Sequence, residues 1–292
     1  MPLSERGIAE HDSLTPMKER EFRLLRELVQ EHTGIWLQDG KRTMLAARLA
    51  KPVRRLGLPG FQSYYALLRE SAEDSPEFVE FVNAITTNKT SFFRERHHFD
   101  YLAQKIVPEI KAASMRGGRK QIRVWSAACS TGEEVYSIAL TLLDAVAEPG
   151  WWLEVVGSDI DTGVLETAQR AIYPAECLES IDELQRQRYF LQGKDSRAGQ
   201  VKLKAEVTRM VELRRVNLMD ERWAADGPFD VIFFRNALIY FQQDVQERFL
   251  RRMTGMLRPG GYLFIGNSEQ IPWMHDRLEP LSQTMYRLRG SG

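Results

Sequence analysis

QIRVWSAACSTGEE, residues 121–134, is the stretch that decides the fold. Its first part, Gln121 to Ser126, is typical of a buried strand. A turn at Gly132 follows, and a helical pattern runs from Glu133 to about Ala147. The stretch therefore predicts a strand, a tight turn and a helix in succession.

Strands and helices of similar length alternate through much of the rest of the chain. We expect a strand at 152–157, a helix at 162–171, a strand at 229–234, a helix at 243–257 and a strand at 261–266, the last after the turn Arg258-Pro-Gly-Gly261. This alternation is typical of an α/β fold with a doubly wound, mostly parallel sheet and helices on both faces.

One segment, about 176–210, interrupts the alternation. Tyr189-Phe-Leu191 and Val201-Lys-Leu-Lys204 flank a polar loop at 193–199. That pattern is typical of a hairpin and predicts a small antiparallel β insert. Residues 210–214 are then expected to rejoin the main sheet in part.

Helical patterns alone occupy the chain before about residue 90. The expected helices start near Thr15-Pro16 and stop at Gly34, run from Lys41 to Leu56, and lie around 64–68 and 78–85. We predict a flexible tail at 1–13, an all-helical domain at 14–90 and the α/β domain at 91–292.

Composition excludes several classes of protein. Forty Lys and Arg balance forty Asp and Glu, so no global charge attracts nucleic acid or anionic membrane. No apolar run reaches the roughly 20 residues that span a bilayer, and the start lacks the apolar segment of a signal peptide. Cys129 and Cys177 have neither disulfide nor zinc spacing, so no metal is expected. We expect a cytoplasmic protein and, because nothing demands more, a monomer.

Ligands of open parallel sheets bind beyond the carboxyl ends of the strands. Gly132 permits a turn there, but a single glycine is not a dinucleotide fingerprint. Glu133 puts an anion at the helix start, which disfavours phosphate and favours a cationic or amine-bearing ligand; alternatively, it merely stabilises the helix. Asp159 is the better candidate for ribose hydroxyls, because Asp161 is explained as a helix cap.

Polar pairs also follow two later strands. Asn217-Leu218 lies where a strand should end, and Arg235-Asn236 ends the strand at 229–234. An Arg-Asn pair after so apolar a run is hard to justify by packing, so we infer a ligand. Asn88, Thr90 and Arg94 surround a Phe pair at the junction of the two domains; they form either a site or a helix terminus with an apolar anchor.

These residues together carry a resemblance to a known family. The ordered motifs are Asn88-x-Thr90-x-Phe92-Phe93-Arg94, Ser126-Ala-Ala-x-Ser130-Thr-Gly-Glu-Glu-x-Tyr136-Ser-Ile-Ala139, Asp159-Ile-Asp161-Thr162 and Phe229-Asp-x-Ile-x-x-Arg235-Asn236-x-x-Ile239-Tyr240-Phe241. The set, spanning about 17–286, resembles the chemotaxis receptor methyltransferases of the CheR type. Small departures occur at Cys129, Val135, Phe234 and Asn267, none of which is a matched ligand.

The resemblance implies a class I, Rossmann-like enzyme that uses S-adenosylmethionine to methylate glutamate side chains of methyl-accepting chemoreceptors. It implies that the cofactor is surrounded by Asn88, Thr90, Arg94, Ala127, Glu133, Asp159, Asn217, Leu218, Arg235 and Asn236. Arg94 and Tyr240 would lie nearest the transferred methyl group. A glutamate is already ionised at pH 7, so we expect transfer by positioning without a general base.

Receptor recognition is expected at two places. Arg48, Lys51 and Arg55 recur on one helix face opposite its apolar stripe, which is either a solvated face or a dock for a Glu-rich receptor helix. Family resemblance suggests that the β insert binds the receptor's C-terminal tail by strand addition. Alternatives are another acceptor on the same fold, or a module that docks without catalysis. The missing glycines disfavour a dehydrogenase, and Gly266-Asn-Ser268-Glu-Gln270 lacks the second glycine of a hydrolase elbow.

Overall fold

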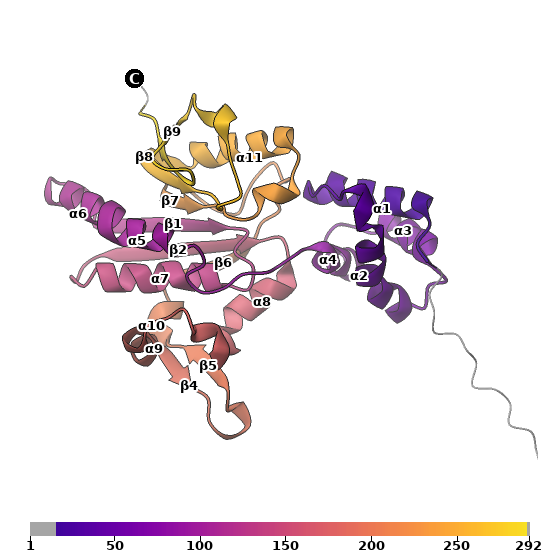
Figure 1. Cartoon of the computed structure of the whole chain (residues 1–292), viewed down its shortest axis with the longest axis horizontal. Coiled ribbons are helices and arrows are strands. Elements are labelled where there is room, and N and C mark those ends of the chain that lie inside the picture. The colour runs from indigo at the N-terminus through magenta and orange to yellow at the C-terminus, as the bar shows by residue number, and fades with distance from the viewer. Residues whose placement is uncertain (1–15, 291–292) are drawn as a thin grey trace, which may run out of the picture. The chain divides into compact units, whose positions relative to one another are not determined.

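The computed structural model describes residues 16–290 (Figure 1). The flexible tail predicted at 1–13 lies outside the described residues, as does Thr15. The chain divides into two compact units, which are described separately. Within the described residues, one comprises 16–30 together with Leu37–Ile85, and the other comprises Glu31–Trp36 together with 86–290.

The first unit is built from helices, as predicted. Its elements are α1 (Glu19–Thr33, whose last turn belongs to the second unit), η1 (Asp39–Lys41), α2 (Arg42–Arg55), α3 (Phe61–Glu70) and α4 (Pro76–Ile85). The expected start of α1 at Thr15-Pro16 is wrong, because the helix begins only at Glu19. The amide of Lys18 donates to Glu21 Oε2 over 2.7 Å, so a carboxylate one turn later supplies the N-terminal bond.

Apolar residues at helical spacing form the core of this unit. Phe22 and Leu25 of α1 and Leu45 and Leu49 of α2 are completely buried. Phe81 of α4 joins them and lies edge-on to a Tyr of α3 at a centroid distance of 6.2 Å. The predicted helical stripes are therefore the buried faces.

The second unit contains a seven-stranded sheet of order β6-β2-β1-β7-β8-β10-β9. The strands are β1 (Gln121–Ala127), β2 (Trp152–Asp159), β6 (Val211–Arg215), β7 (Phe229–Phe233), β8 (Leu257–Phe264), β9 (Leu278–Pro280) and β10 (Met285–Leu288). β6, β2, β1, β7 and β8 are parallel, whereas β10 is antiparallel to both β8 and β9. The prediction of a mostly parallel sheet is confirmed.

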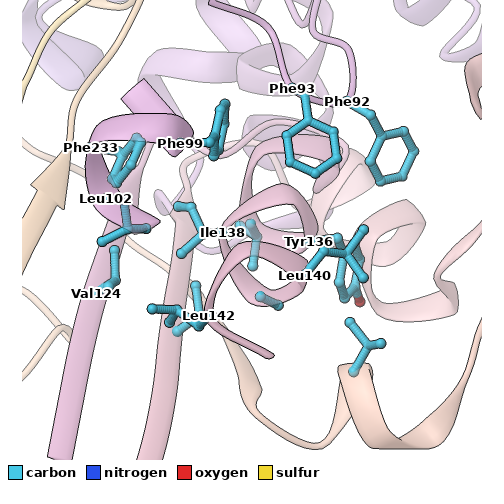
Figure 2. Close-up of a cluster of buried hydrophobic side chains, with 14 of the residues drawn as sticks. Phe92, Phe93, Phe99, Leu102, Val124, Tyr136, Ile138, Leu140, Leu142 and Phe233 are labelled. Carbon is cyan, nitrogen blue, oxygen red and sulfur yellow. The ribbon is translucent and has the colours of Figure 1, made fainter. Parts of the chain in front are cut away.

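Helices cover both faces of this sheet, as Figure 1 shows for α7 and α11. The helices of the unit are α5 (His97–Tyr101), η2 (Leu102–Ile106), α6 (Val107–Met115), α7 (Glu133–Ala145), α8 (Thr162–Arg170), α9 (Glu183–Tyr189), α10 (Ala205–Thr208), η5 (Leu238–Tyr240), α11 (Gln243–Gly255) and η6 (Pro272–Met274). Neighbouring strand residues face opposite ways, so Val124 packs with α7 and Trp125 packs with α11. Figure 2 shows the first of these cores.

The predicted β insert is a three-stranded antiparallel sheet of order β3-β5-β4. Its strands are β3 (Ile172–Pro174), β4 (Phe190–Gln192) and β5 (Gln200–Leu203), with two short 3-10 turns, η3 (Ala175–Leu178) and η4 (Asp195–Arg197). The hairpin of β4 and β5 was predicted, but β3 starts before the expected beginning of the insert. After the insert, β6 pairs with β2 along its whole length.

The turn predicted at Arg258–Gly261 lies inside β8. β7 and β8 pair at Phe229/Leu257 and again at Val231/Tyr262, so the four residues 258–261 lie beside a register shift. The chain thus bulges where Pro and Gly occur, but the strand continues.

Candidate functional site

The carboxyl ends of β6, β2, β1 and β7 meet at one edge of the sheet. Ala127 pairs with Ser158, Asp159 pairs with Arg215, and Ser126 pairs with Phe233. Because the strands are parallel, the loops that follow them share this edge. The predicted residues Ala127, Asp159, Asn217 and Arg235 are therefore brought to one region.

The loop after β1 takes an unusual backbone path. Ala128, Ser130 and Gly132 all have positive φ, of 60°, 52° and 96°. A Cβ at Gly132 would lie 2.7 Å from the Cβ of Ala168 in α8, so the glycine allows close packing of that helix. The contact accounts for this glycine without a ligand.

Asp159 holds this loop in place. Its Oδ2 accepts a hydrogen bond from the amide of Ser130 at 2.9 Å, and its Oδ1 accepts one from the amide of Asp161 at 3.0 Å. Burial raises the pKa of Asp159 to about 6, against the effect of these bonds. The carboxylate lies at the strand end, as predicted.

The two glutamates at the start of α7 have different surroundings. Glu133 is 8% exposed, and its Oε2 accepts a hydrogen bond from Thr131 Oγ1 at 2.6 Å. Burial raises its pKa. Glu134 instead accepts a bond from Ser126 Oγ at 2.8 Å and lies 3.4 Å from the guanidinium of Arg235. The backbone amide of Glu133 also favours its ionised side chain, so both alternatives, a ligand contact and stabilisation of the helix start, stay open for Glu133.

Asp161 caps α8, as predicted. Its Oδ1 accepts bonds from the amides of Gly163 and Val164 at 2.9 and 3.2 Å. Its Oδ2 accepts bonds from Asn88 Nδ2 at 2.7 Å and Thr86 Oγ1 at 2.6 Å. The side chain of Asn88 is thus turned to this carboxylate, while Thr90, two residues on, is half-buried.

Arg94 lies between two strained residues. Phe93 and Glu95 have φ of 51° and 59°, in the left-handed region that non-glycine residues rarely adopt. Arg94 is half-buried and donates to the carbonyl of Lys89 over 3.0 Å. The amide of Phe93 donates to Ser137 Oγ of α7 over 2.8 Å. Phe92 and Phe93 are buried above α7 (Figure 2), so the Phe pair is indeed an apolar anchor.

Arg235 is enclosed by the protein. Its guanidinium has no exposed surface, lies 3.4 Å from each of Glu95 and Glu134, and donates to the carbonyl of Arg94. It also lies 5.5 Å from the ring centroid of Phe99. Two carboxylates and an aromatic face compensate the charge, but Nη1 has no hydrogen-bond partner among residues 16–290, so the protein's own contacts account for this arginine only in part.

Asn236 and Tyr240 lie in the loop after β7. Asn236 has φ of 58° and donates from Nδ2 to Glu95 Oε1 over 3.2 Å. Tyr240 ends the 3-10 turn η5 and is half-buried, and its carbonyl accepts a bond from the amide of Trp36 at 2.8 Å. Tyr240 thus belongs to the same edge of the sheet as Asn236.

Asn217 and Leu218 lie in the loop after β6. Asn217 Nδ2 donates to the carbonyl of His32 over 2.7 Å, and its Oδ1 accepts from the amide of Met219 at 3.0 Å. Leu218 is half-buried, and its carbonyl accepts from Trp223 Nε1 at 3.2 Å. These bonds fix the loop at the edge where the two residues were expected.

Sequence reasoning missed four residues of this region, namely the buried His98 and Glu269 and the half-buried Glu95 and Glu134. Glu134 was visible only as part of an acidic helix start. His98 is completely buried and contacts Thr284 Oγ1 at 2.8 Å. Burial, the Arg235 charge and His97 lower the pKa of His98 to about 2. No spacing rule marks single residues of this kind, because their partners lie far away along the chain.

The basic residues predicted to form a docking face lie on α2. Arg48 is half-buried and donates to the carbonyl of Ile85 over 2.6 Å. Arg55 is paired with Glu80, with Nε 3.0 Å from Oε2. Lys51 is exposed. The expectation that all three share a solvated face is wrong for Arg48.

Two family models match the chain. The model described as CheR methyltransferase, SAM binding domain, matches residues 88–287, and the model described as CheR methyltransferase, all-alpha domain, matches residues 20–86. The chain belongs to the CheR methyltransferase family. It is therefore a methyltransferase, and its cofactor is S-adenosylmethionine.

Curated members of the CheR family are similar along most of their length. A chemotaxis protein methyltransferase of Klebsiella aerogenes is 43% identical over 97% of this chain and 94% of its own. That of Escherichia coli strain K12 is 43% identical over 93% of this chain and 92% of its own. Chemotaxis protein methyltransferase 2 of Pseudomonas aeruginosa is 40% identical over 91% of this chain and 92% of its own.

The residues at the sheet edge fit the cofactor of the CheR family. S-adenosylmethionine carries a sulfonium, an amine, a carboxylate and a ribose diol, so it needs both acidic and basic partners. Glu133 and Asp159 would hold the amine and the hydroxyls, and Arg94 would hold the carboxylate. Arg235 Nη1 is buried without a hydrogen-bond partner among residues 16–290, so it retains a donor at this edge. Within the same residues, no group of three His, Cys, Asp or Glu is suited to a metal, and no helix is long and apolar enough to cross a membrane.

Proposed function

We propose that the chain methylates glutamate side chains of chemoreceptor cytoplasmic helices and forms methyl esters. Support comes from the gathering of Arg94, Glu133, Asp159 and Asn236 at one sheet edge, inside the region that matches the SAM-binding domain of the CheR family. The relatives are named as chemotaxis protein methyltransferases, which favours a chemoreceptor as the acceptor. We further propose that the enzyme acts in the cytoplasm as a monomer.

The chemistry of the acceptor explains why no general base is required. The cofactor supplies an electrophilic methyl group on a sulfonium. A glutamate carboxylate has an ordinary pKa of about 4.3 and is ionised at neutral pH, so it can attack without losing a proton. The residues of the chain then have two tasks, which are to align the reacting groups and to exclude water.

Arg94 and Tyr240 are the residues to which we assign the alignment. Arg94 is held from both sides, by the strained neighbours Phe93 and Glu95 and by the bond that Arg235 makes to its carbonyl. Tyr240 presents a phenol on a short turn whose carbonyl is bonded to Trp36. In this proposal, Arg94 orients the cofactor and Tyr240 orients the carboxylate.

The proposal is tested with methyl-labelled S-adenosylmethionine and purified receptor cytoplasmic fragments. We expect label on the receptor that mild base releases as methanol, because methyl esters are base-labile. A fragment with Gln in place of each methylated Glu is the matched control and should take up no label. Cofactor binding without transfer to any receptor would refute the proposal in favour of another acceptor or a binding module.

Recognition of the receptor tail is assigned to the β insert. β4 and β3 are the outer strands of its three-stranded sheet, so each has one edge unpaired within the insert. An extended C-terminal peptide would add to such an edge. Calorimetry with candidate tail peptides tests this, with a scrambled peptide as the control, and heat from both peptides alike would contradict it.

A further inference from the structure

The segment Asn236–Tyr240 depends on side chains for its backbone hydrogen bonds. Asn236 is left-handed, with φ of 58°, and the 3-10 turn η5 after it is only three residues long. The carbonyl of Leu238, inside the segment, and that of Phe241, directly after it, both accept bonds from Gln246 Nε2 of α11, each at 2.9 Å. These carbonyls are thus held from α11. The amide of Tyr240 bonds within the turn to the carbonyl of Ala237, whereas the amide of Asn236 needs a partner outside the segment because buried N–H groups rarely remain unpaired.

Glu269 supplies the partner for the amide of Asn236. It is 4% exposed and follows β8, and its Oε2 accepts a bond from the amide of Asn236 at 2.9 Å and one from the amide of Gly266 at 2.6 Å. The backbone of Leu238 and Ile239 also favours its ionised form. Burial nevertheless raises the pKa of Glu269. Oε2 of this buried carboxylate is therefore used by two backbone donors, while Oε1 has no hydrogen-bond partner among residues 16–290.

A second carboxylate holds the other side of Asn236. Glu95 Oε1 accepts bonds from Asn236 Nδ2 and from the amide of Asn267, both at 3.2 Å. A Cβ at Gly266 would lie 2.3 Å from Asn236 Nδ2, so the loop after β8 presses closely on that side chain. Glu269 thus acts in a region that tolerates little displacement.

We propose that Glu269 is a positioning residue for methyl transfer, which fixes the backbone of Asn236–Tyr240 and through it the phenol of Tyr240. The inference rests on the proposed function, because that proposal puts Tyr240 next to the transferred methyl group. Glu269 itself contacts neither substrate nor cofactor in this account. Gln at this position keeps the shape and one acceptor oxygen, but it removes the negative charge that Oε2 shares between the amides of Asn236 and Gly266, and it replaces the second oxygen by an N–H donor.

The first test does not depend on activity. Hydrogen exchange, followed by mass spectrometry on the free enzyme, should show faster exchange in the peptide covering 236–241 of Glu269→Gln than in the wild type. Asp230→Asn is the matched control, because Asp230 is a buried carboxylate at the other end of β7 that accepts from the amide of Arg123 at 2.7 Å. It should leave exchange at 236–241 unchanged. Unchanged exchange in Glu269→Gln would overturn the proposal.

The second test is a kinetic double-mutant cycle. Glu269→Gln should lower kcat about tenfold, while the Kd of S-adenosylhomocysteine rises by no more than about threefold, because misplaced reacting groups lose rate before affinity. In a Tyr240→Phe background the same substitution should have little further effect on kcat. If the fold-losses in kcat of the two single variants multiply in the double variant, the two residues act independently and Glu269 is merely structural.

Two outcomes separate the positioning role from the proposed function. If the wild type transfers no methyl group to any receptor, the proposed function fails, and the exchange experiment still decides whether Glu269 holds the segment. If Glu269→Gln does not fold, Gln246→Ala loosens the same segment from its carbonyl side without disturbing a buried charge. Faster exchange at 236–241 and a lower kcat in Gln246→Ala are expected, and their absence would overturn the proposal.

Discussion

Asn88 donates a hydrogen bond from Nδ2 to Oδ2 of Asp161 over 2.7 Å, and the other oxygen of Asp161 caps α8. One carboxylate therefore performs two tasks. It satisfies the first amides of a helix, which the sequence predicted, and it fixes the segment that leads to Arg94, which the sequence did not. The helix cap is consequently coupled to the geometry of the proposed cofactor site.

Asp161→Ala should therefore affect stability and cofactor affinity together. Loss of the cap lowers the free energy of unfolding by about 1 to 2 kcal/mol. Loss of the bond to Asn88, worth about 1 kcal/mol, should raise the Kd of S-adenosylhomocysteine about fivefold. Asp182→Ala is the matched control, because Asp182 caps α9 by accepting from the amide of Gln185 at 2.9 Å. Denaturant unfolding measures the stability of each variant, and calorimetry measures its Kd for S-adenosylhomocysteine. Equal Kd values for the two variants would contradict the coupling.

His98 should make the protein less stable as the pH falls. Its pKa is lowered from 6.5 to about 2, chiefly by burial, so below the unfolded pKa of 6.5 only the unfolded chain gains the proton. The stabilising contribution of neutral His98 is therefore present above pH 6.5 and decreases below it. From about pH 7.5 to about pH 5.5 the loss is roughly 1.4 kcal/mol.

His98→Phe retains an aromatic ring beside Phe264, whose ring is stacked on His98 at 5.1 Å. It also removes the titrating group. Over the same pH interval, the free energy of unfolding should fall by about 1.4 kcal/mol less in the variant than in the wild type. At neutral pH the variant is less stable than the wild type, because Thr284 loses a partner. Urea unfolding at several pH values measures this, and parallel pH curves would argue against a neutral, buried His98.

Arg235→Met should be strongly destabilising. The substitution keeps an unbranched apolar stem near Phe99 but leaves the carboxylates of Glu95 and Glu134 without their counter-ion. Breaking a buried pair in this way costs about 3 to 5 kcal/mol. Adding Glu134→Gln should restore at least about 1 kcal/mol, since one uncompensated charge is removed.

Arg123→Met is the control for this comparison. Arg123 pairs with Glu154 at 2.5 Å, but both side chains retain some exposure, 13% and 20%. Only one carboxylate loses its partner here, and at 20% exposed it keeps more contact with water than Glu95 and Glu134, which are 10% and 14% exposed, so the expected loss is smaller, about 2 kcal/mol. Equal losses in Arg123→Met and Arg235→Met would show that burial of the Arg235 cluster is energetically unimportant.

The fold was predictable because its signals are local. Val124 and Trp125 lie in a short apolar run between polar residues, and such runs separated by helical patterns define a parallel sheet. Asp161 was recognised as a cap for the same reason, since its partners are two and three residues away. β9 and β10 were not predicted, because they are short and are stabilised by pairing at the end of the sheet.

The charge network could not be predicted, because its members are distant in sequence. Glu95 meets Arg235 and Asn236 across about 140 residues, and Glu269 meets Asn236 across 33. A single glutamate in a polar stretch gives no sign that it is buried. The same limit explains Arg48, whose acceptor is the last carbonyl of a different helix.

Lys51 is the residue of α2 with which receptor docking is best tested. Reversing Arg48 or Arg55 would also break the bond to Ile85 or the pair with Glu80, so a loss of activity would be ambiguous. Lys51 is exposed, so Lys51→Glu changes the surface charge alone. If a Glu-rich receptor helix docks on this face, the KM for receptor should rise about threefold or more at low salt, with kcat unchanged. The effect should decrease as salt is raised.

Lys105→Glu, a charge reversal at an exposed residue of η2, is the matched control. Equal KM values for the two variants would exclude α2 from the docking surface.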